Sequence, residues 1–184
     1  MPGQGMITLV LGGARSGKSV YAETLALSRP GPRYYLATAE VYDSEMAERV
    51  RVHQQRRGVG VGGPIPVAGG WITVEAPLDL AGALRRHGAA PGVTVLVDCL
   101  TLWLSNLMAG ERDIDAETAG LLAACDGLGG FVIFVASEVG LGIVPDNALA
   151  RAFRDHAGRL NQAVAARADR VVFVAAGLPL TLKP

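Results

Sequence analysis

The strongest constraint on the fold of this 184-residue chain is a glycine-rich loop near its N-terminus. Residues 12–19, GGARSGKS, match the pattern G-x-x-x-x-G-K-[ST] in full and follow the apolar run ITLVL at residues 7–11. Such a loop joins a buried strand to the start of a helix. Its backbone N–H groups and the helix N-terminus then surround an anion. The segment therefore predicts a strand–loop–helix unit that binds phosphate.

Further short apolar runs alternate with helical patterns along the chain. Strands are predicted at residues 34–37, 72–75, 93–98, 131–135 and 171–175, and helices at residues 19–28, 45–57, 78–87, 100–108, 116–125 and 147–168. In the last helix, the expected apolar face comprises Leu149, Phe153, Leu160 and Val164. The strands are apolar throughout, as in sheets that helices cover on both faces. The chain therefore predicts one α/β domain over residues 1–184, with a mostly parallel, P-loop NTPase-like sheet and helices on both faces.

Composition excludes several classes of protein. The 17 basic residues balance the 17 acidic ones, so no strong positive charge favours nucleic acid or an anionic membrane. No apolar run approaches the ~20 residues of a membrane span, and the N-terminus does not resemble a signal peptide. The two cysteines, Cys99 and Cys125, form no metal-binding or disulfide pattern and are expected to be buried. A soluble, cytoplasmic globular protein with no nucleic-acid partner is the expectation.

Polar residues follow several predicted strands. Thr38, Glu75, Asp98 and Glu138 lie at or just beyond strand ends, and the carboxyl ends of parallel strands form the ligand crevice. Asp98 ends a buried strand and is interpreted as the carboxylate associated with Mg²⁺, although an aspartate there could also cap the next helix. Lys18 is expected to reach the β- and γ-phosphates of a nucleotide, and Ser19 to ligate Mg²⁺.

One predicted helix carries a histidine among arginines. Arg49, His53, Arg56 and Arg57 have spacings that place them on one helix face. Guanidinium groups could hold a phosphate beside a neutral, nucleophilic imidazole. A solvated basic face is the alternative. Residues 58–70, with six glycines and two prolines, are expected to form a surface loop, either a tolerated insertion or a lid.

The other two histidines are not assigned to catalysis. His87 is interpreted as the polar end of a helix. His156 lies within the long C-terminal helix, and we expect it to be structural or to face a partner.

Together these segments resemble the bifunctional adenosylcobinamide kinase/adenosylcobinamide-phosphate guanylyltransferase family of cobalamin biosynthesis. The resemblance runs nearly end to end. Its motifs are GGARSGKS (12–19), LATA (36–39), D-x-E-M (43–46) with Arg49 and His53, W-x-T-x-E (71–75), DCLTLW (98–103), EVG-x-GIVP (138–145), R-x-FRD (151–155), GRLNQ (158–162) and AGLP (176–179). The loop motif is generic, whereas the segments between residues 138 and 162 are specific to this family.

The resemblance implies two activities. The first phosphorylates the aminopropanol hydroxyl of adenosylcobinamide with ATP or GTP. The second transfers GMP from GTP through a guanylylated histidine, which falls on His53, and yields adenosylcobinamide-GDP. The implied nucleotide contacts are Gly12, Gly13, Ala14, Arg15, Ser16, Gly17, Lys18, Ser19, Ala37, Thr38, Ala39, Gln54, Gln55, Arg56, Arg57, Glu75 and Asp98. A homo-oligomer, arranged as a trimer, is also implied.

Two departures from the family pattern stand out. Ser137 replaces the usual asparagine before Glu138, which shortens the reach of any substrate contact there. The glycine-rich stretch after Arg57 is longer than usual, so the spacing between His53 and Glu75 does not indicate their geometry. Two further functions remain open from the residues alone: a P-loop kinase without a covalent intermediate, and a GTP-dependent switch, although the N-K-x-D guanine-reading element of switch GTPases is absent.

Overall fold

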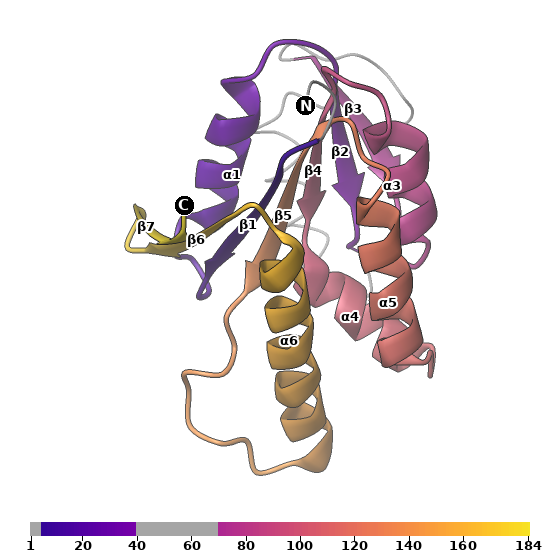
Figure 1. Ribbon diagram of the computed structural model, residues 1–184. Coiled ribbons are helices and arrows are strands. Elements are labelled where there is room, and N and C mark those ends of the chain that lie inside the picture. The colour runs from indigo at the N-terminus through magenta and orange to yellow at the C-terminus, as the bar shows by residue number, and fades with distance from the viewer. Residues whose placement is uncertain (1–4, 40–69) are drawn as a thin grey trace.

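The computed structural model describes residues 5–39 and 70–184 and contains a seven-stranded sheet between two layers of helices (Figure 1). The strands are β1 (Ile7–Gly12), β2 (Arg33–Ala37), β3 (Trp71–Glu75), β4 (Thr94–Asp98), β5 (Phe131–Ser137), β6 (Arg170–Ala175) and β7 (Leu178–Lys183). Their order is β3-β2-β4-β5-β1-β6-β7. All neighbouring pairs are parallel except β6 and β7. The predicted mostly parallel α/β architecture is therefore confirmed.

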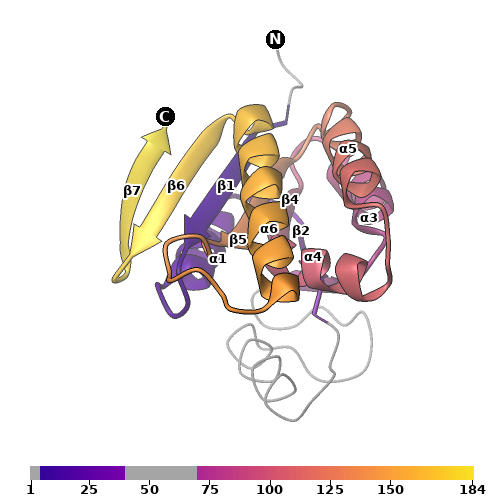
Figure 2. The same cartoon turned by 90° about the horizontal axis from the view of Figure 1, so that it is seen from below.

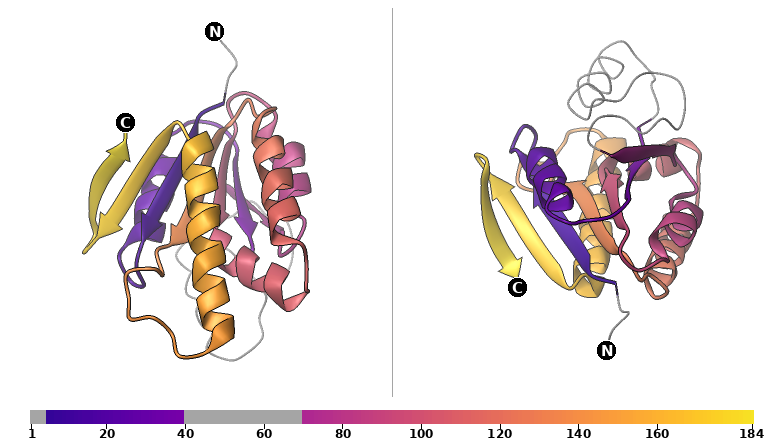
Figure 3. Two further views of the ribbon diagram at one scale, coloured as in Figure 1. Left: turned by 60° about the horizontal axis from the view of Figure 1, so that its bottom comes forward. Right: turned by 90° about the horizontal axis from the view of Figure 1, so that it is seen from above.

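Five helices lie within the described residues: α1 (Lys18–Leu27), α3 (Leu80–Gly88), α4 (Leu100–Ala109), α5 (Ile114–Cys125) and α6 (Ala148–Arg167). Helix α1 covers one face of the sheet, and the other four cover the opposite face (Figures 2 and 3). The helix predicted at residues 45–57 lies outside the described residues, as does all of the loop predicted at residues 58–70 except Gly70. Among the helices in the described ranges, none has both the length and the apolar character to cross a bilayer.

Alternate residues of each central strand pack against different helices. Leu9 of β1 belongs to the same buried cluster as Trp103 of α4 and Leu160 of α6. Its neighbour Val10 belongs to the second cluster, with Ala22 of α1. Because both faces are covered, both sets of side chains must be apolar, which explains why the sequence does not alternate. The expectation drawn from the apolar runs is confirmed.

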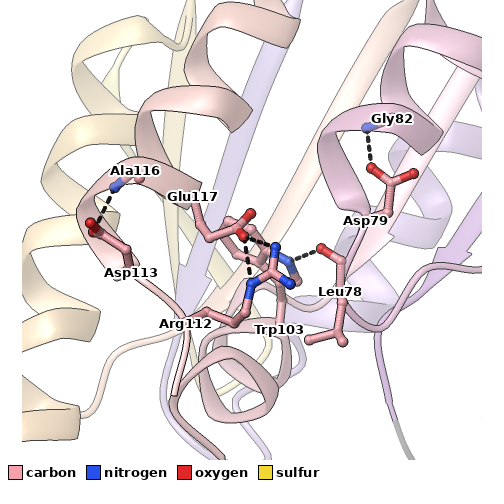
Figure 4. A network of polar contacts seen from close by, with 8 residues as sticks. All are labelled: Leu78, Asp79, Gly82, Trp103, Arg112, Asp113, Ala116 and Glu117. Atoms are coloured by element: carbon pink, nitrogen blue, oxygen red, sulfur yellow. Dashed lines mark hydrogen bonds and ion pairs between the residues drawn. The ribbon is translucent and has the colours of Figure 1, made fainter. Parts of the chain in front are cut away.

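Side-chain caps set the starts of two helices on the α3–α5 face (Figure 4). The Asp79 carboxylate accepts a hydrogen bond from the Gly82 N–H at 2.9 Å, and Asp113 caps α5 in the same way. The indole N–H of Trp103 donates to the Leu78 carbonyl at 2.9 Å, so the buried ring leaves no donor unsatisfied. These bonds fix the segment after β3 against α4.

Strand β7 was not predicted. Its six residues, LPLTLK, are all exposed, and it pairs only with β6 at the edge of the sheet. An edge strand that is exposed and contains a proline lacks the buried apolar run from which the other strands were predicted. The β6–β7 turn uses two residues in the left-handed region, Ala176 at φ 51° and Gly177 at φ 79°.

The predicted apolar face of α6 is correct for Leu160 and Val164 but wrong for Leu149, which is 71% exposed. A 20-residue helix spans about 30 Å, whereas a six-residue strand such as β6 spans only about 20 Å. The first turn of α6 therefore projects beyond the sheet, as Figure 1 shows, and Leu149 has no core to enter.

Candidate functional site

The glycine-rich loop connects β1 directly to α1. Gly17 has φ 94°, a left-handed conformation that favours glycine, and Arg15 has φ 55°. The Ser16 N–H donates to the Gly13 carbonyl at 3.3 Å, which closes a turn at the start of the loop. The predicted strand–loop–helix unit is thus present, with the N-terminus of α1 directed into the loop.

The β6–β7 turn supports this loop. The N–H of Gly177 donates to the Ser16 carbonyl at 2.8 Å, and a Cβ placed on Gly17 would lie 3.1 Å from the Gly177 Cα. A Cβ on Gly12 would lie 2.4 Å from Ser16 Oγ and 2.6 Å from the Val174 carbonyl oxygen. Both glycines are therefore required by close backbone approach.

Polar groups that could meet a phosphate gather in this loop. The Lys18 ammonium donates to the Gly13 carbonyl at 3.0 Å, so it folds back across the loop. Ser16 Oγ is buried and has no hydrogen-bond partner among the described residues. A buried hydroxyl without a partner costs free energy unless a ligand or water satisfies it. The loop therefore offers one ammonium and one hydroxyl to an anion, in addition to its backbone N–H groups.

Asp98 lies at the same end of the sheet as the loop, where the parallel strands have their carboxyl ends. Strand β5 separates β4 from β1, and the register pairs Gly12 with Ser137 and Val135 with Asp98. The Tyr35 hydroxyl lies 3.2 Å from Asp98 Oδ2 and donates to it. Asp98 is partly buried.

The other two residues predicted at strand ends, Glu75 and Glu138, differ in their surroundings. Glu75 ends β3 and is exposed. The backbone N–H of Glu138 donates to the Gly12 carbonyl at 3.1 Å, which joins the end of β5 to the start of the phosphate loop. Ala37 and Ala39, at the end of β2, are half-buried, and Ala14 and Arg15 are exposed at the tip of the loop.

Thr38 lies just beyond the end of β2, as predicted, and its side chain is buried, with 0% exposure. Its hydroxyl accepts from the Cys99 N–H at 2.8 Å and donates to the Cys99 carbonyl at 2.7 Å. The buried Asn106 amide donates to the carbonyls of Thr38 and Pro77 at 2.8 and 3.0 Å. Thr38 and Asn106 thus clamp together the segments that follow β2, β3 and β4, next to Asp98.

Sequence reasoning missed Tyr35, Thr101 and Asn106. The Thr101 hydroxyl accepts from the Ser137 N–H at 2.7 Å, so it fixes the end of β5. The available signal was the position of Asn106 within the apolar helix LTLWLSNLMA, since a buried amide needs polar partners. Thr101 and Tyr35 have no comparable signal because threonine and tyrosine are common beside strands.

The cysteines and His87 behave as the sequence predicts. Burial raises the pKa of the Cys99 thiol to about 11; the Asp98 charge adds to this increase and the Lys18 ammonium opposes it. Burial likewise raises the pKa of Cys125 to about 11. Both thiols are therefore neutral at physiological pH and poor nucleophiles. Burial and the charge of Arg86 lower the pKa of His87 at the end of α3.

The helix predicted to carry the nucleophile is not placed. Arg49, His53, Gln54, Gln55, Arg56 and Arg57 all lie outside the described residues.

Comparison with known proteins identifies the chemistry. Residues 8–182 match the model of the cobinamide kinase/cobinamide phosphate guanyltransferase family. The chain belongs to this family. The bifunctional adenosylcobalamin biosynthesis protein CobP of Pseudomonas aeruginosa is 45% identical over 180 residues, covering 97% of this chain and 98% of the relative. Its counterpart CobU of Salmonella typhimurium is 39% identical over 193 residues, covering 97% of this chain and all of the relative.

As a member of the cobinamide kinase/guanyltransferase family, the protein is a bifunctional enzyme of adenosylcobalamin biosynthesis. Its fold also resembles the crystal structure of the flagellar accessory protein FlaH from Methanocaldococcus jannaschii. The TM-score is 0.54 at 13% identity, with coverage of 98% of this chain and 79% of FlaH. At that identity the likeness shows the fold alone, a P-loop NTPase-like sheet.

Proposed function

We propose that residues 12–19 hold the phosphate chain of the nucleotide in both reactions of this enzyme, ATP or GTP in the first and GTP in the second. One observation carries the proposal. The phosphate loop and Asp98 both lie at the carboxyl ends of the parallel strands, and the single strand β5 separates β1 from β4. The Lys18 ammonium already crosses the loop where a phosphate would lie. In a water-poor site such a fixed charge stabilises the developing negative charge of phosphoryl transfer.

The oxygen ligands at this end of the sheet fit Mg²⁺. The ion prefers oxygen ligands and keeps several waters, so it needs one or two protein groups besides substrate phosphates. Asp98 supplies a carboxylate and Ser19, in the first turn of α1, a hydroxyl. Within residues 5–39 and 70–184, no cluster of three or more His, Cys, Asp or Glu side chains competes as a metal site. When bound, Mg²⁺ would offset charge on the phosphate oxygens.

The first reaction is a direct transfer. The aminopropanol hydroxyl of adenosylcobinamide attacks the γ-phosphorus of ATP or GTP, the bond to the β-phosphate oxygen breaks, and the hydroxyl proton passes to solvent or a base. Lys18 offsets the charge on the phosphate oxygens, and the loop N–H groups fix the phosphate chain in line.

The second reaction proceeds in two steps. The imidazole of His53 attacks the α-phosphorus of GTP and pyrophosphate leaves, so GMP becomes attached to the ring nitrogen. A phosphate oxygen of the corrinoid then attacks the same phosphorus and releases the imidazole, which yields adenosylcobinamide-GDP. Arg49, Arg56 and Arg57 would hold the phosphoryl oxygens. Splitting the transfer lets the corrinoid attack after pyrophosphate has left.

Two further properties are the assembly and the location of the enzyme. The resemblance implies a homo-oligomer with three subunits, and the composition favours action in the cytoplasm without a nucleic-acid partner. Of the functions left open by the residues alone, a simple kinase and a GTP-dependent switch, neither fits the bifunctional family.

The metal assignment is tested by Asp98→Asn, which removes the charge but keeps the shape of the side chain. The Mg²⁺ concentration for half-maximal rate should rise on the order of 100-fold in both reactions, with partial rescue at high Mg²⁺. Titration of the initial rate with Mg²⁺ measures this effect. A wild-type enzyme indifferent to Mg²⁺, or an Asp98→Asn enzyme with unchanged dependence, contradicts the assignment.

The same Mg²⁺ titration of Thr38→Val should show a smaller effect than that of Asp98→Asn. Valine matches the shape of threonine but lacks the hydroxyl that holds both backbone groups of Cys99. We expect the Mg²⁺ requirement to rise about tenfold, because Asp98 loses its positioning neighbour. Thr38→Ser keeps the hydroxyl and should restore the wild-type value. A stability loss in Thr38→Val without any change in Mg²⁺ requirement would show that the clamp is only structural.

A further inference from the structure

A groove separate from the phosphate loop lies between α6 and the segment that joins it to β5. It has a volume of about 600 Å³, and its lining includes Gly140, Gly142, Arg154, Gly158, Arg159 and Gln162. The nucleotide chemistry proposed above uses none of these residues. We propose that this groove binds the corrinoid substrate; the inference rests on the proposed nucleotide site, which leaves the groove free.

The segment that forms one wall of the groove begins next to the phosphate loop. The Glu138 N–H donates to the Gly12 carbonyl at 3.1 Å, and Ser137 pairs with Gly12 across the strands. Residues 138–147 leave the sheet at the edge that carries the phosphate loop and return to the start of α6 (Figures 1 and 3). A substrate in the groove would therefore have its reacting group directed toward the nucleotide phosphates, as both transfers require.

The segment over residues 138–147 is held at both ends. The Glu138 carboxylate accepts from the Gly140 N–H at 2.5 Å. At the other end, the Arg151 guanidinium donates to the carbonyls of Pro145 and Asp146 at 3.0 and 2.8 Å, and Asn147 caps α6. The wall of the groove is thus built before substrate arrives, which lowers the entropic cost of binding.

Three apolar side chains of the segment over residues 138–147 are exposed in the described part of the chain. Val144 lines the groove and is 59% exposed, and Leu141 and Ile143 of the same segment, which lie outside the lining of the groove, are 83% and 98% exposed. Exposed apolar groups concentrated on one fixed segment mark a binding surface. Such side chains favour a ligand with an apolar body over a phosphate chain.

The opposite wall, on α6, is polar. Arg159 is exposed and forms no ion pair with another described residue, while Arg154 has only a 3.8 Å contact with Asp155. Gln162 adds an amide. A corrinoid combines an apolar macrocycle with peripheral amides and, after the first reaction, a phosphate. Arginine and glutamine donors match those amide and phosphate oxygens, and the glycines leave room for the macrocycle.

Gly158→Leu tests the groove without weakening the helix. A Cβ on Gly158 meets no heavy atom within 4 Å, and leucine favours a helix over glycine, so the melting temperature should not fall. The side chain fills space in the groove. We expect the Kd for adenosylcobinamide, measured without nucleotide by equilibrium dialysis and corrinoid absorbance, to rise about tenfold or more. The KM for GTP and the yield of adduct from α-labelled GTP should stay unchanged.

Arg159→Glu should weaken adenosylcobinamide binding in the same direction, and more strongly for the phosphorylated intermediate. Arg85→Glu, the same charge reversal on α3, is the matched control and should leave both affinities unchanged. Because dialysis without nucleotide does not involve the phosphate loop, a failure of the nucleotide proposal would leave these results intact.

Three results would overturn the proposal. The first is an unchanged Kd for adenosylcobinamide in both Gly158→Leu and Arg159→Glu. The second is an equal rise in the KM for GTP, which would assign the groove to the nucleotide. The third is a lower oligomer mass in sedimentation for either variant, which would make the groove an interface between copies of the chain.

Discussion

Lys18→Ala is expected to lower kcat/KM for both reactions by a factor on the order of 10² to 10³. This is the usual cost of removing one fixed group that stabilises the negative charge of a transition state. The Lys18 ammonium lies 3.0 Å from the Gly13 carbonyl and therefore crosses the space enclosed by the loop. Kinase and transferase turnover both develop charge on a nucleotide phosphate chain, so a shared loop predicts a shared loss. Initial rates with ATP or GTP, and with GTP plus the phosphorylated corrinoid, measure the two effects separately.

Lys183→Ala is the matched control. Lys183 donates to carbonyls at the C-terminal end of α6, including those of Ala165 and Ala166, and takes no part in the phosphate loop. Its loss should lower the melting temperature slightly, since the end of α6 loses its donor, while both rates stay near the wild-type value. If either reaction proceeds at full rate in Lys18→Ala, that reaction does not use this loop.

His53→Ala should abolish transfer of GMP while phosphorylation of adenosylcobinamide largely persists. The imidazole is the proposed nucleophile only in the second reaction; the first passes the γ-phosphate directly to the corrinoid hydroxyl. With GTP labelled at the α-phosphate, wild-type protein should retain label after denaturation and the variant should retain none. The adduct should be labile in acid and stable in base, as expected for a P–N bond and unlike a serine ester.

His87→Ala provides the control for this labelling. The His87 ring lies 4.7 Å from the ring of Tyr34, near the start of β2 and therefore at the opposite end of the parallel strands from the phosphate loop, so its removal should leave adduct formation intact. Label retained by His53→Ala would place the nucleophile elsewhere. His156 of α6 would be tested next, because its Nδ1 is buried without a hydrogen-bond partner among the described residues.

Much of the fold could be predicted because its signals are local. The pattern of residues 12–19 identifies a strand, a loop and a helix start together, and each central strand is mainly apolar, with Thr8 and Thr94 as buried polar exceptions. The edge strand β7 and the exposed Leu149 escaped prediction for a different reason. Both lie where the sheet ends, and the position of that boundary depends on how far each element extends in space.

The candidate site was predictable only in part. Glycines and the lysine of the loop are fixed by backbone geometry, and Asp98 is fixed by the end of its strand. Thr38 shows where that reasoning stops. Its position after β2 suggested a rim group, yet its hydroxyl turns inward to Cys99, because Asn106 of α4 supplies the other half of a buried clamp. Such a clamp requires segments 61 to 68 residues apart, which spacing along the chain does not reveal.

The central claim is that one phosphate site, built from residues 12–19 and Asp98, serves both reactions. The most direct measurement is an experimental structure of the protein with Mg²⁺ and a non-hydrolysable GTP analogue. It should show phosphate oxygens against the N–H groups of the loop and the Lys18 ammonium, with Mg²⁺ bound by the Ser19 hydroxyl on the side of Asp98. Triphosphate bound away from this loop, or a metal held by other side chains, would contradict the account.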